Sequence, residues 1–79
     1  MKCIITGGAG FIGSNLAEKL VQLDHKVIII DNLSTGKIKN LKNIKNKIKF
    51  INHDISKDTE KFRSYFNKVD WVFHLAGLA

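Results

Sequence analysis

The amino-acid sequence predicts an α/β fold with a parallel β-sheet, and three observations lead to this fold class. Four apolar segments have the length of strands, and they span residues 2–6, 27–31, 48–53 and 70–76. The segments between them carry apolar residues at helical spacing. The first strand runs directly into glycines at positions 7, 10 and 13, which is typical of a strand–turn–helix unit. With right-handed crossovers, the strands take the spatial order 3-2-1-4, the N-terminal half of a doubly wound, Rossmann-like fold.

The first half of the chain has the clearer pattern. Residues 11–23 are expected to form a helix, because apolar residues recur on one of its faces. These residues are Ile12, Leu16, Leu20 and Leu23. Residues 24–25 form the turn that follows. Residues 27–31 are apolar up to a final aspartate, as expected for a parallel strand that is buried on both faces.

The second half of the chain repeats this alternation. After a polar loop at 32–37, residues 37–46 are expected to form a short amphipathic helix, since every third residue is apolar. The apolar residues are Ile38, Leu41 and Ile44. A further helix is expected to begin at a cap, Ser56 or Asp58, and to run to about residue 67. Its apolar side consists of Phe62, Tyr65, Phe66 and Val69.

Length and composition indicate one globular domain, residues 1–79. Hydrophobic residues make up 44%, which is too many for a disordered chain. The sequence contains neither an apolar run long enough to span a membrane nor a signal peptide, so a cytoplasmic protein without membrane contact is expected. Cys3 is the only cysteine, and it lies in a strand, which favours a place in the core. No metal site is predicted.

The net charge of +6 comes from one segment. Between residues 32 and 53 there are six lysines and no acid, namely Lys37, Lys39, Lys42, Lys45, Lys47 and Lys49. This segment is either a solvated helix face or a basic surface for nucleic acid or a ligand phosphate. A nucleic-acid surface would need aromatic residues between the lysines, and the segment has none. We therefore favour the solvated face and expect no nucleic-acid partner, with a basic binding or assembly module as the alternative.

The glycine turn is the strongest functional signal. Gly7 allows a sharp turn off the strand, where a positive φ is expected. Gly10 has no Cβ, so a pyrophosphate can approach the backbone, and Gly13 lets the helix pack closely on the strand. The N–H groups of the first helical turn have no partner within the helix and favour an anion. The alternative is a tight turn without a ligand.

Asp31 ends the second strand, a little under twenty residues after Gly13, where dinucleotide-binding folds place a ribose-binding carboxylate. Its oxygens can accept hydrogen bonds from both ribose hydroxyls, and its charge would repel a 2′-phosphate. The expected cofactor is therefore NAD rather than NADP. The alternative role for Asp31 is that of a helix or turn cap.

Four motifs together resemble the extended short-chain dehydrogenase/reductase family. They are Thr-Gly-Gly-Ala-Gly-Phe-Ile-Gly-Ser at 6–14, Asp-Asn-Leu-Ser-Thr-Gly at 31–36, His-Asp-Ile at 53–55 and Phe-His-Leu-Ala-Gly-Leu-Ala at 73–79. Within that family the sequence is most similar to sugar-nucleotide epimerases of the UDP-glucose (UDP-galactose) 4-epimerase type. Related dehydratases and decarboxylases share much of this half of the fold. The resemblance covers the whole chain.

The resemblance implies roles for further residues. The pyrophosphate loop would consist of Gly7, Gly10, Phe11, Ile12 and Gly13. The adenosine ribose would contact Asp31 and Asn32, with Ser34, Thr35 and Gly36 beside them. The adenine pocket would include Asp54 and Ile55, although an aspartate after a strand often only bonds its own backbone. The wall along the nicotinamide-side ribose would consist of Leu75, Ala76 and Gly77. The residues His53 and His74 are expected to be strand residues rather than ligands.

The catalytic residues of the family are not matched in this sequence. The family uses a Tyr-x-x-x-Lys pair, but the only tyrosine here is Tyr65, and residue 69 is valine. The 79-residue chain is therefore expected to bind NAD and to be inactive by itself. The fourth strand would form an open edge, with Trp71, Phe73 and Leu75 poorly covered. We accordingly expect self-association through this edge.

Overall fold

The computed structural model describes residues 1–7, 9–32, 38–53 and 60–75. Within these ranges the strands are β1 (Lys2–Thr6), β2 (Lys26–Asp31), β3 (Ile48–Asn52) and β4 (Trp71–His74). The α-helices are α1 (Phe11–Gln22) and α2 (Glu60–Ser64), and the 3-10 helices are η1 (Ile38–Leu41) and η2 (Lys45–Lys47). The strands lie within one or two residues of their predicted bounds.

The four strands form one parallel sheet in the order β3-β2-β1-β4, which confirms the predicted fold class. The β1 strand is central, with Thr6 paired to Ile30 of β2 on one side and to His74 of β4 on the other. All four strands run in the same direction, so their carboxyl ends meet at one edge of the sheet. This edge is where open α/β sheets bind ligands.

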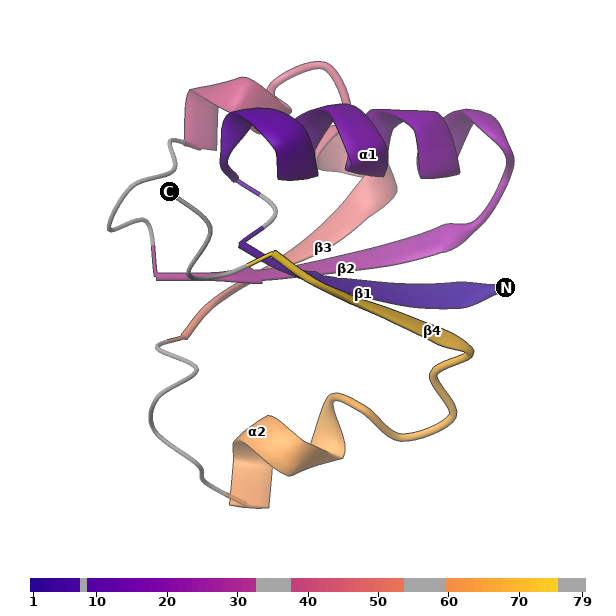
Figure 1. The fold of residues 1–79 in the computed structure, drawn as a ribbon, viewed down its shortest axis with the longest axis vertical. Helices are drawn as coiled ribbons and strands as arrows, with labels where there is room; N and C mark the ends of the chain where they lie inside the picture. The colour runs from indigo at the N-terminus through magenta and orange to yellow at the C-terminus, as the bar shows by residue number, and fades with distance from the viewer. Residues whose placement is uncertain (8, 33–37, 54–59, 76–79) are drawn as a thin grey trace.

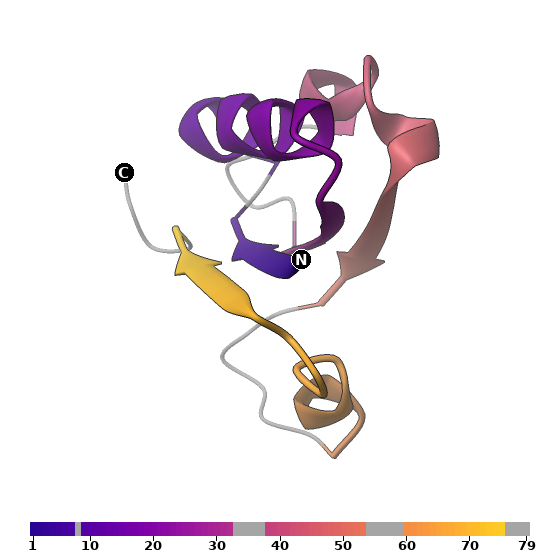
Figure 2. The same ribbon diagram turned by 90° about the vertical axis from the view of Figure 1, so that its right-hand side faces the viewer.

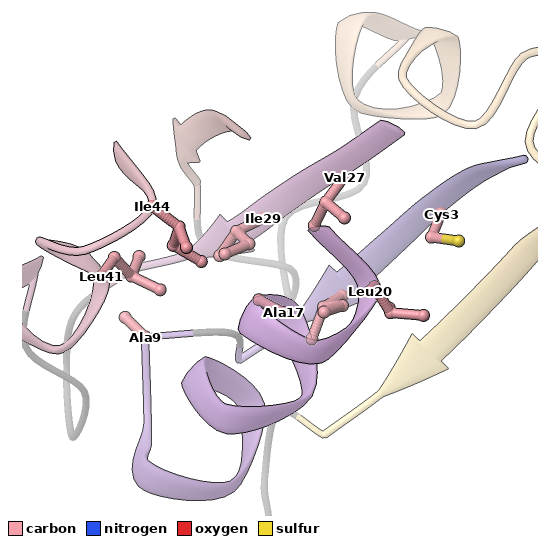
Figure 3. Close-up of a cluster of buried hydrophobic side chains, with 9 residues drawn as sticks. Cys3, Ala9, Ala17, Leu20, Val27, Ile29, Leu41 and Ile44 are labelled. Carbon is pink, nitrogen blue, oxygen red and sulfur yellow. The ribbon is translucent and has the colours of Figure 1, made fainter. Parts of the chain in front are cut away.

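Helices cover both faces of the sheet, α1 on one face and α2 on the other (Figures 1 and 2). Side chains alternate along β1 and β2, so each strand contributes to two cores. On the α1 side the core consists of Cys3, Ile5, Ala9, Ala17, Leu20, Val27, Ile29, Leu41 and Ile44 (Figure 3). On the α2 side it consists of Ile4, Ile28 and Ile30, with Ile51, Tyr65, Phe66 and Val69 packed against them. The apolar composition of the second strand therefore reflects burial on both faces, as predicted.

The prediction of one amphipathic helix over 37–46 is wrong. In its described part the segment forms η1, a turn at 42–44, and η2. The apolar residues explain the difference, because a repeat of exactly three residues matches the three residues per turn of a 3-10 helix rather than 3.6. The prediction that the apolar side is buried holds for Leu41, 1% exposed, and for Ile44, 5% exposed.

The helix predicted to run to about residue 67 ends earlier. The α2 helix stops at Ser64, and residues 65–68 form a turn. Lys68 has a φ of 59°, which turns the chain out of the helix toward the sheet. The N–H of Asp70 then donates to the carbonyl of Lys2 at 2.8 Å, and the N–H of Lys2 donates to the Asp70 carboxylate at 2.8 Å. The proposed caps Ser56 and Asp58 lie outside the described residues.

The β4 strand forms an edge of the sheet, as expected. The predicted exposure holds for Trp71, which is 43% exposed, and Val72 is 50% exposed as well. The prediction that Phe73 and Leu75 are poorly covered is wrong, because both are half-buried against the core on the α1 side. An open pocket is lined by residues 70–73. Within β4, Phe73 is therefore the residue that is partly covered, while Trp71, Val72 and His74 are exposed.

Cys3 is fully buried in the core on the α1 side. Burial raises the pKa of its thiol, the nearby N-terminal ammonium lowers it, and the charge of Asp70 raises it. A neutral, buried thiol packs as a small apolar side chain, as predicted.

Over the described ranges, no helix has both the length and the apolar character that a membrane crossing requires.

Candidate functional site

The candidate site lies at the carboxyl end of the sheet, where the chain leaves β1 for α1. The glycine turn connects these two elements, and Asp31 stands at the end of the neighbouring strand β2. The described ends of all four strands lie along this edge, with Asp31 paired to Asn52 and Thr6 paired to His74.

Gly7 makes the turn off the first strand. Its φ is 76°, which confirms the predicted positive value and is a conformation that glycine adopts without strain. Its N–H donates to the carbonyl of Ile30 at 2.8 Å, so the turn stays attached to β2. The requirement for glycine at this position therefore comes from the backbone.

Gly10 is different, because nothing in the described chain requires a glycine there. Its φ of −75° and ψ of 174° are accessible to any residue. A Cβ on Gly10 would meet the carbonyl oxygen of Gly7 at 3.5 Å, which is an ordinary contact. The missing side chain thus leaves room next to the start of α1. This is where the predicted pyrophosphate approach to the backbone would need room.

The α1 helix begins at this point without a capping side chain. Gly10 is its N-cap residue, forms no side-chain cap, and is followed by a first turn without acidic residues. Ser14 is the first residue whose N–H bonds within the helix, to the carbonyl of Gly10 at 2.9 Å. The N–H groups of Phe11, Ile12 and Gly13 come before it and carry the positive end of the helix dipole. Such a helix end can bind an anion.

Phe11 and Ile12 are both strongly exposed, at 80% and 62%. Gly13 is buried. The side chains of Ser14 and Asn15 donate to the carbonyl of Phe11 at 3.0 Å and 2.9 Å. These bonds stabilise the first turn through the Phe11 carbonyl, and they do not involve the N–H groups of that turn.

Asp31 contacts the glycine turn directly. Its Oδ2 accepts a hydrogen bond from the N–H of Ala9 at 3.0 Å, and the residue is 8% exposed. Its backbone carbonyl accepts the N–H of His53 at 3.3 Å, which joins β2 to β3. Asp31 therefore bonds to the glycine turn, as in the turn-cap role that we considered as the alternative, although it does not cap α1. This bond is compatible with ribose binding, because a carboxylate has two oxygens with about four acceptor positions.

Asn40 is a contributor that sequence reasoning missed. Its Nδ2 donates to the carbonyl of Ala9 at 2.8 Å, across 31 residues of sequence. Asn40 lies in η1, between Lys39 and Leu41, within the lysine-rich segment that we interpreted as a solvated face. No periodicity distinguishes it from the exposed asparagines around it, so a single sequence offers no signal for this contact.

Thr6 and His74 link the ends of β1 and β4. Thr6 Oγ1 and His74 Nδ1 are 2.7 Å apart, and Thr6 is almost fully buried. The N–H of Leu75 donates to the carbonyl of Thr6 at 2.9 Å. These bonds hold His74 and Leu75 beside the end of β1, at the edge of the sheet where the glycine turn begins. His74 is a strand residue, as expected, while His53 directly follows β3.

The structure thus brings together Gly7, Gly10 and Asp31 from the predicted set. Asn32 is exposed beside them, and Leu75 is half-buried after β4. The remaining predicted contacts lie outside the described residues, namely Ser34, Thr35, Gly36, Asp54, Ile55, Ala76 and Gly77.

Among the residues that are described, no three metal-binding side chains lie close enough together to hold an ion. The described lysines of the basic segment, Lys39, Lys42, Lys45, Lys47 and Lys49, are all exposed.

Comparison with known proteins gives consistent matches over nearly the whole chain. A family model described as GDP-mannose 4,6 dehydratase matches residues 4–79. A UDP-N-acetyl-α-D-glucosaminuronate decarboxylase from Bacillus cytotoxicus is 46% identical over 77 residues, which cover 98% of this chain and 24% of the relative.

Two solved structures have the same fold over the same region. The UDP-glucose 4-epimerase of Thermotoga maritima, solved with UDP-glucose, matches with a TM-score of 0.87 and 41% identity, over 100% of this chain and 25% of that one. The dTDP-glucose 4,6-dehydratase of Bacillus anthracis, solved in complex with NAD, matches with a TM-score of 0.86 and 30% identity, over 96% of this chain and 26% of that one.

These relatives carry three different activities, and the chain spans about a quarter of the length of each. What they share is the fold and the region that contains the glycine turn. The chain belongs to the GDP-mannose 4,6 dehydratase family, among the extended short-chain dehydrogenases/reductases that include sugar-nucleotide epimerases and decarboxylases.

Proposed function

We propose that this chain binds NAD at the carboxyl end of its sheet and is the cofactor-binding part of a sugar-nucleotide 4-epimerase-like enzyme. The observation that carries the proposal is the start of α1. The helix has neither a capping side chain nor an acidic residue in its first turn. It begins at Gly10, where neither the backbone conformation nor the packing would exclude a side chain. A dinucleotide pyrophosphate is the ligand that this combination favours.

The roles of the residues follow from charge and geometry. The N–H groups of Phe11 and Ile12 would donate to the pyrophosphate oxygens, next to the space that Gly10 leaves open. Asp31 would accept hydrogen bonds from the ribose hydroxyls, and its negative charge would disfavour the 2′-phosphate of NADP. Asn32 lies exposed beside it. NAD bound in one of the relatives supports this assignment.

The chemistry would come from the cofactor, which accepts and returns a hydride. The residues of this chain would hold the dinucleotide and orient it. The family's Tyr-x-x-x-Lys pair is not among these residues, because Val69 stands four residues after Tyr65, the only tyrosine. The epimerase assignment rests on the motifs at 31–36 and 73–79, while dehydratase and decarboxylase relatives make those two activities the alternatives.

The test is a titration of the 15N-labelled chain with NAD, followed by NMR. We expect saturable shifts of the Phe11, Ile12 and Gly13 amides. The variant Gly10→Ala should fold like the unchanged chain, because the new Cβ meets only one atom, at 3.5 Å. It should bind NAD at least tenfold more weakly, since the methyl group occupies the space that the pyrophosphate needs.

The variant Gly7→Ala provides the contrast. At a φ of 76° an alanine is strained by about 1–2 kcal/mol, so this variant should lose stability in a urea titration, whereas Gly10→Ala should not. Absence of any amide shift at millimolar NAD, or equal affinities of Gly10→Ala and the unchanged chain, would contradict the proposal.

We further propose that the chain associates with itself through the open edge at β4. Trp71 and Val72 are exposed there on opposite faces of the strand, and unpaired strand edges bind other strands. The pocket along residues 70–73 belongs to the same edge.

A further inference from the structure

Ala9 stands at the centre of the glycine turn, and side chains from two other segments bond to both of its backbone polar groups. The residue is fully buried, and within the described ranges neither its N–H nor its carbonyl forms a backbone hydrogen bond to β1 or α1. Buried backbone groups need partners, and leaving one unpaired costs about 1–3 kcal/mol. Asp31 accepts the N–H, and Asn40 donates to the carbonyl.

These two bonds act on successive peptide groups. The bond from Asn40 holds the peptide group that joins Ala9 to Gly10, because that group contains the Ala9 carbonyl. The N–H of the same peptide group is the Gly10 N–H, which donates to the Gly7 carbonyl at 3.2 Å. Rotation of this peptide group would break a hydrogen bond at each of its ends. The direction in which the chain enters α1 is thereby set.

The position of Asn40 is itself determined by packing. Its neighbour Leu41 is 1% exposed and belongs to the same core as Ala9 and Ala17, so η1 is anchored beside the glycine turn (Figure 3). The anchor lowers the entropy cost of holding the Asn40 side chain in place. Asn40 is exposed as a residue, but the bond to Ala9 is partly buried.

We propose that Asn40 is a positioning residue of the NAD site: it holds the Ala9–Gly10 peptide group so that the first N–H groups of α1 point at the pyrophosphate. This inference rests on the proposed function and extends it to the segment between β2 and β3. Without the amide donor, the permissive backbone of Gly10 allows the peptide group to rotate, and the helix end loses its fixed orientation.

The neighbouring Asn43 makes a matched control possible. It is exposed in the turn after η1, within the same lysine-rich segment. The variants Asn40→Asp and Asn43→Asp add the same charge to this segment, but only the first replaces the donor to Ala9 with an acceptor. The variants Asn40→Ser and Asn43→Ser make the comparison without a change of charge.

The experiment measures NAD affinity by calorimetry, amide chemical shifts without NAD, and the thermal midpoint for each variant. We expect both Asn40 variants to bind NAD about five- to tenfold more weakly, the effect of one lost hydrogen bond. Their amide shifts should change at residues 9–11 without NAD, a local signature that general destabilisation would not produce. The Asn43 variants should match the unchanged chain in both measurements.

Three outcomes would overturn the inference. If the unchanged chain binds NAD and the Asn40 and Asn43 variants bind it equally well, Asn40 has no positioning role. The proposed function would then still hold. If the Asn40 variants change amide chemical shifts over the whole sheet and have a lowered thermal midpoint, Asn40 contributes only to the stability of the fold. Absence of NAD binding by the unchanged chain would remove the proposed function and the positioning role together.

Discussion

The carboxylate of Asp31 takes part in the structure of the glycine turn as well as in the proposed recognition of ribose. Its Oδ2 accepts the Ala9 N–H, which fixes the side chain at the end of β2 before any ligand arrives. A pre-positioned carboxylate pays less entropy when a ligand binds. Capping and binding, which the sequence presents as alternatives, are therefore compatible in one residue.

The substitution Asp31→Asn separates these two tasks. The amide oxygen of asparagine can still accept the Ala9 N–H, so we expect the fold to be kept. NAD should bind about tenfold more weakly, because a hydrogen bond to a charged acceptor is worth about 1.5–3 kcal/mol and the charge is lost. The preference for NAD over NADP should shrink as well, since nothing then repels the 2′-phosphate. Calorimetric titrations with both dinucleotides measure the two effects.

The control for this variant is Asp24→Asn, the same chemical change at an exposed turn residue with a φ of 64°. Asparagine tolerates the left-handed region well, so this variant should behave like the unchanged chain. Unchanged discrimination between NAD and NADP in Asp31→Asn would show that the Asp31 charge does not select the cofactor.

At the scale of elements, the connections determine how the helices meet the sheet. The turn after α2 is the clearest case, because Lys68 adopts a φ of 59° without being a glycine. The left-handed conformation costs about 1–2 kcal/mol for a residue with a side chain. The paired hydrogen bonds between Lys2 and Asp70 hold the chain on the sheet directly after this turn.

We therefore expect Lys68→Gly to be more stable than Lys68→Ala by about 1 kcal/mol in urea unfolding. Both variants remove the same charged side chain, so the comparison isolates the backbone. The greater conformational freedom of glycine in the unfolded state offsets part of the stability that Lys68→Gly gains from relieved backbone strain. Equal midpoints of the two variants would show that the turn relaxes when the side chain is shortened.

The segment between β2 and β3 also shows what patterns at this scale can predict. The burial of Leu41 and Ile44 follows from their spacing, but the same spacing fits two kinds of helix. The contact from Asn40 to Ala9 depends on where η1 docks. No local property of the residues around Asn40 contains that information.

For the whole molecule, the uneven coverage of the sheet is the main feature. The β1 and β2 strands are buried on both faces, while β4 is an edge with Trp71 and Val72 exposed. Trp71 makes edge contacts with the rings of His25, at 5.7 Å, and Phe73, at 6.2 Å, and is still 43% exposed. Such an edge, apolar and unpaired, favours association with another strand.

We expect the chain to sediment as a concentration-dependent mixture of monomers and larger species. The variant Val72→Lys should shift this mixture toward the monomer, because a lysine on an edge strand disfavours pairing. Leu23→Lys is the control, since Leu23 is similarly exposed, at 56%, but lies at the end of α1. A monomer at every concentration, or equal effects of both variants, would contradict self-association through β4.

The sequence by itself determined the strand order, the glycine turn with its positive φ at Gly7, and the family. The glycine turn and the elements follow from local signals, namely apolar runs, helical spacing and glycines at set intervals. The strand order follows from these elements together with the right-handed crossovers of parallel strands. Only the tertiary structure decided that Asp31 and Asn40 hold Ala9 between them, that η1 is a 3-10 helix, and that Gly10 leaves open space. The physical reason is that each of these depends on contacts between distant segments, which form only when the helices dock on the sheet.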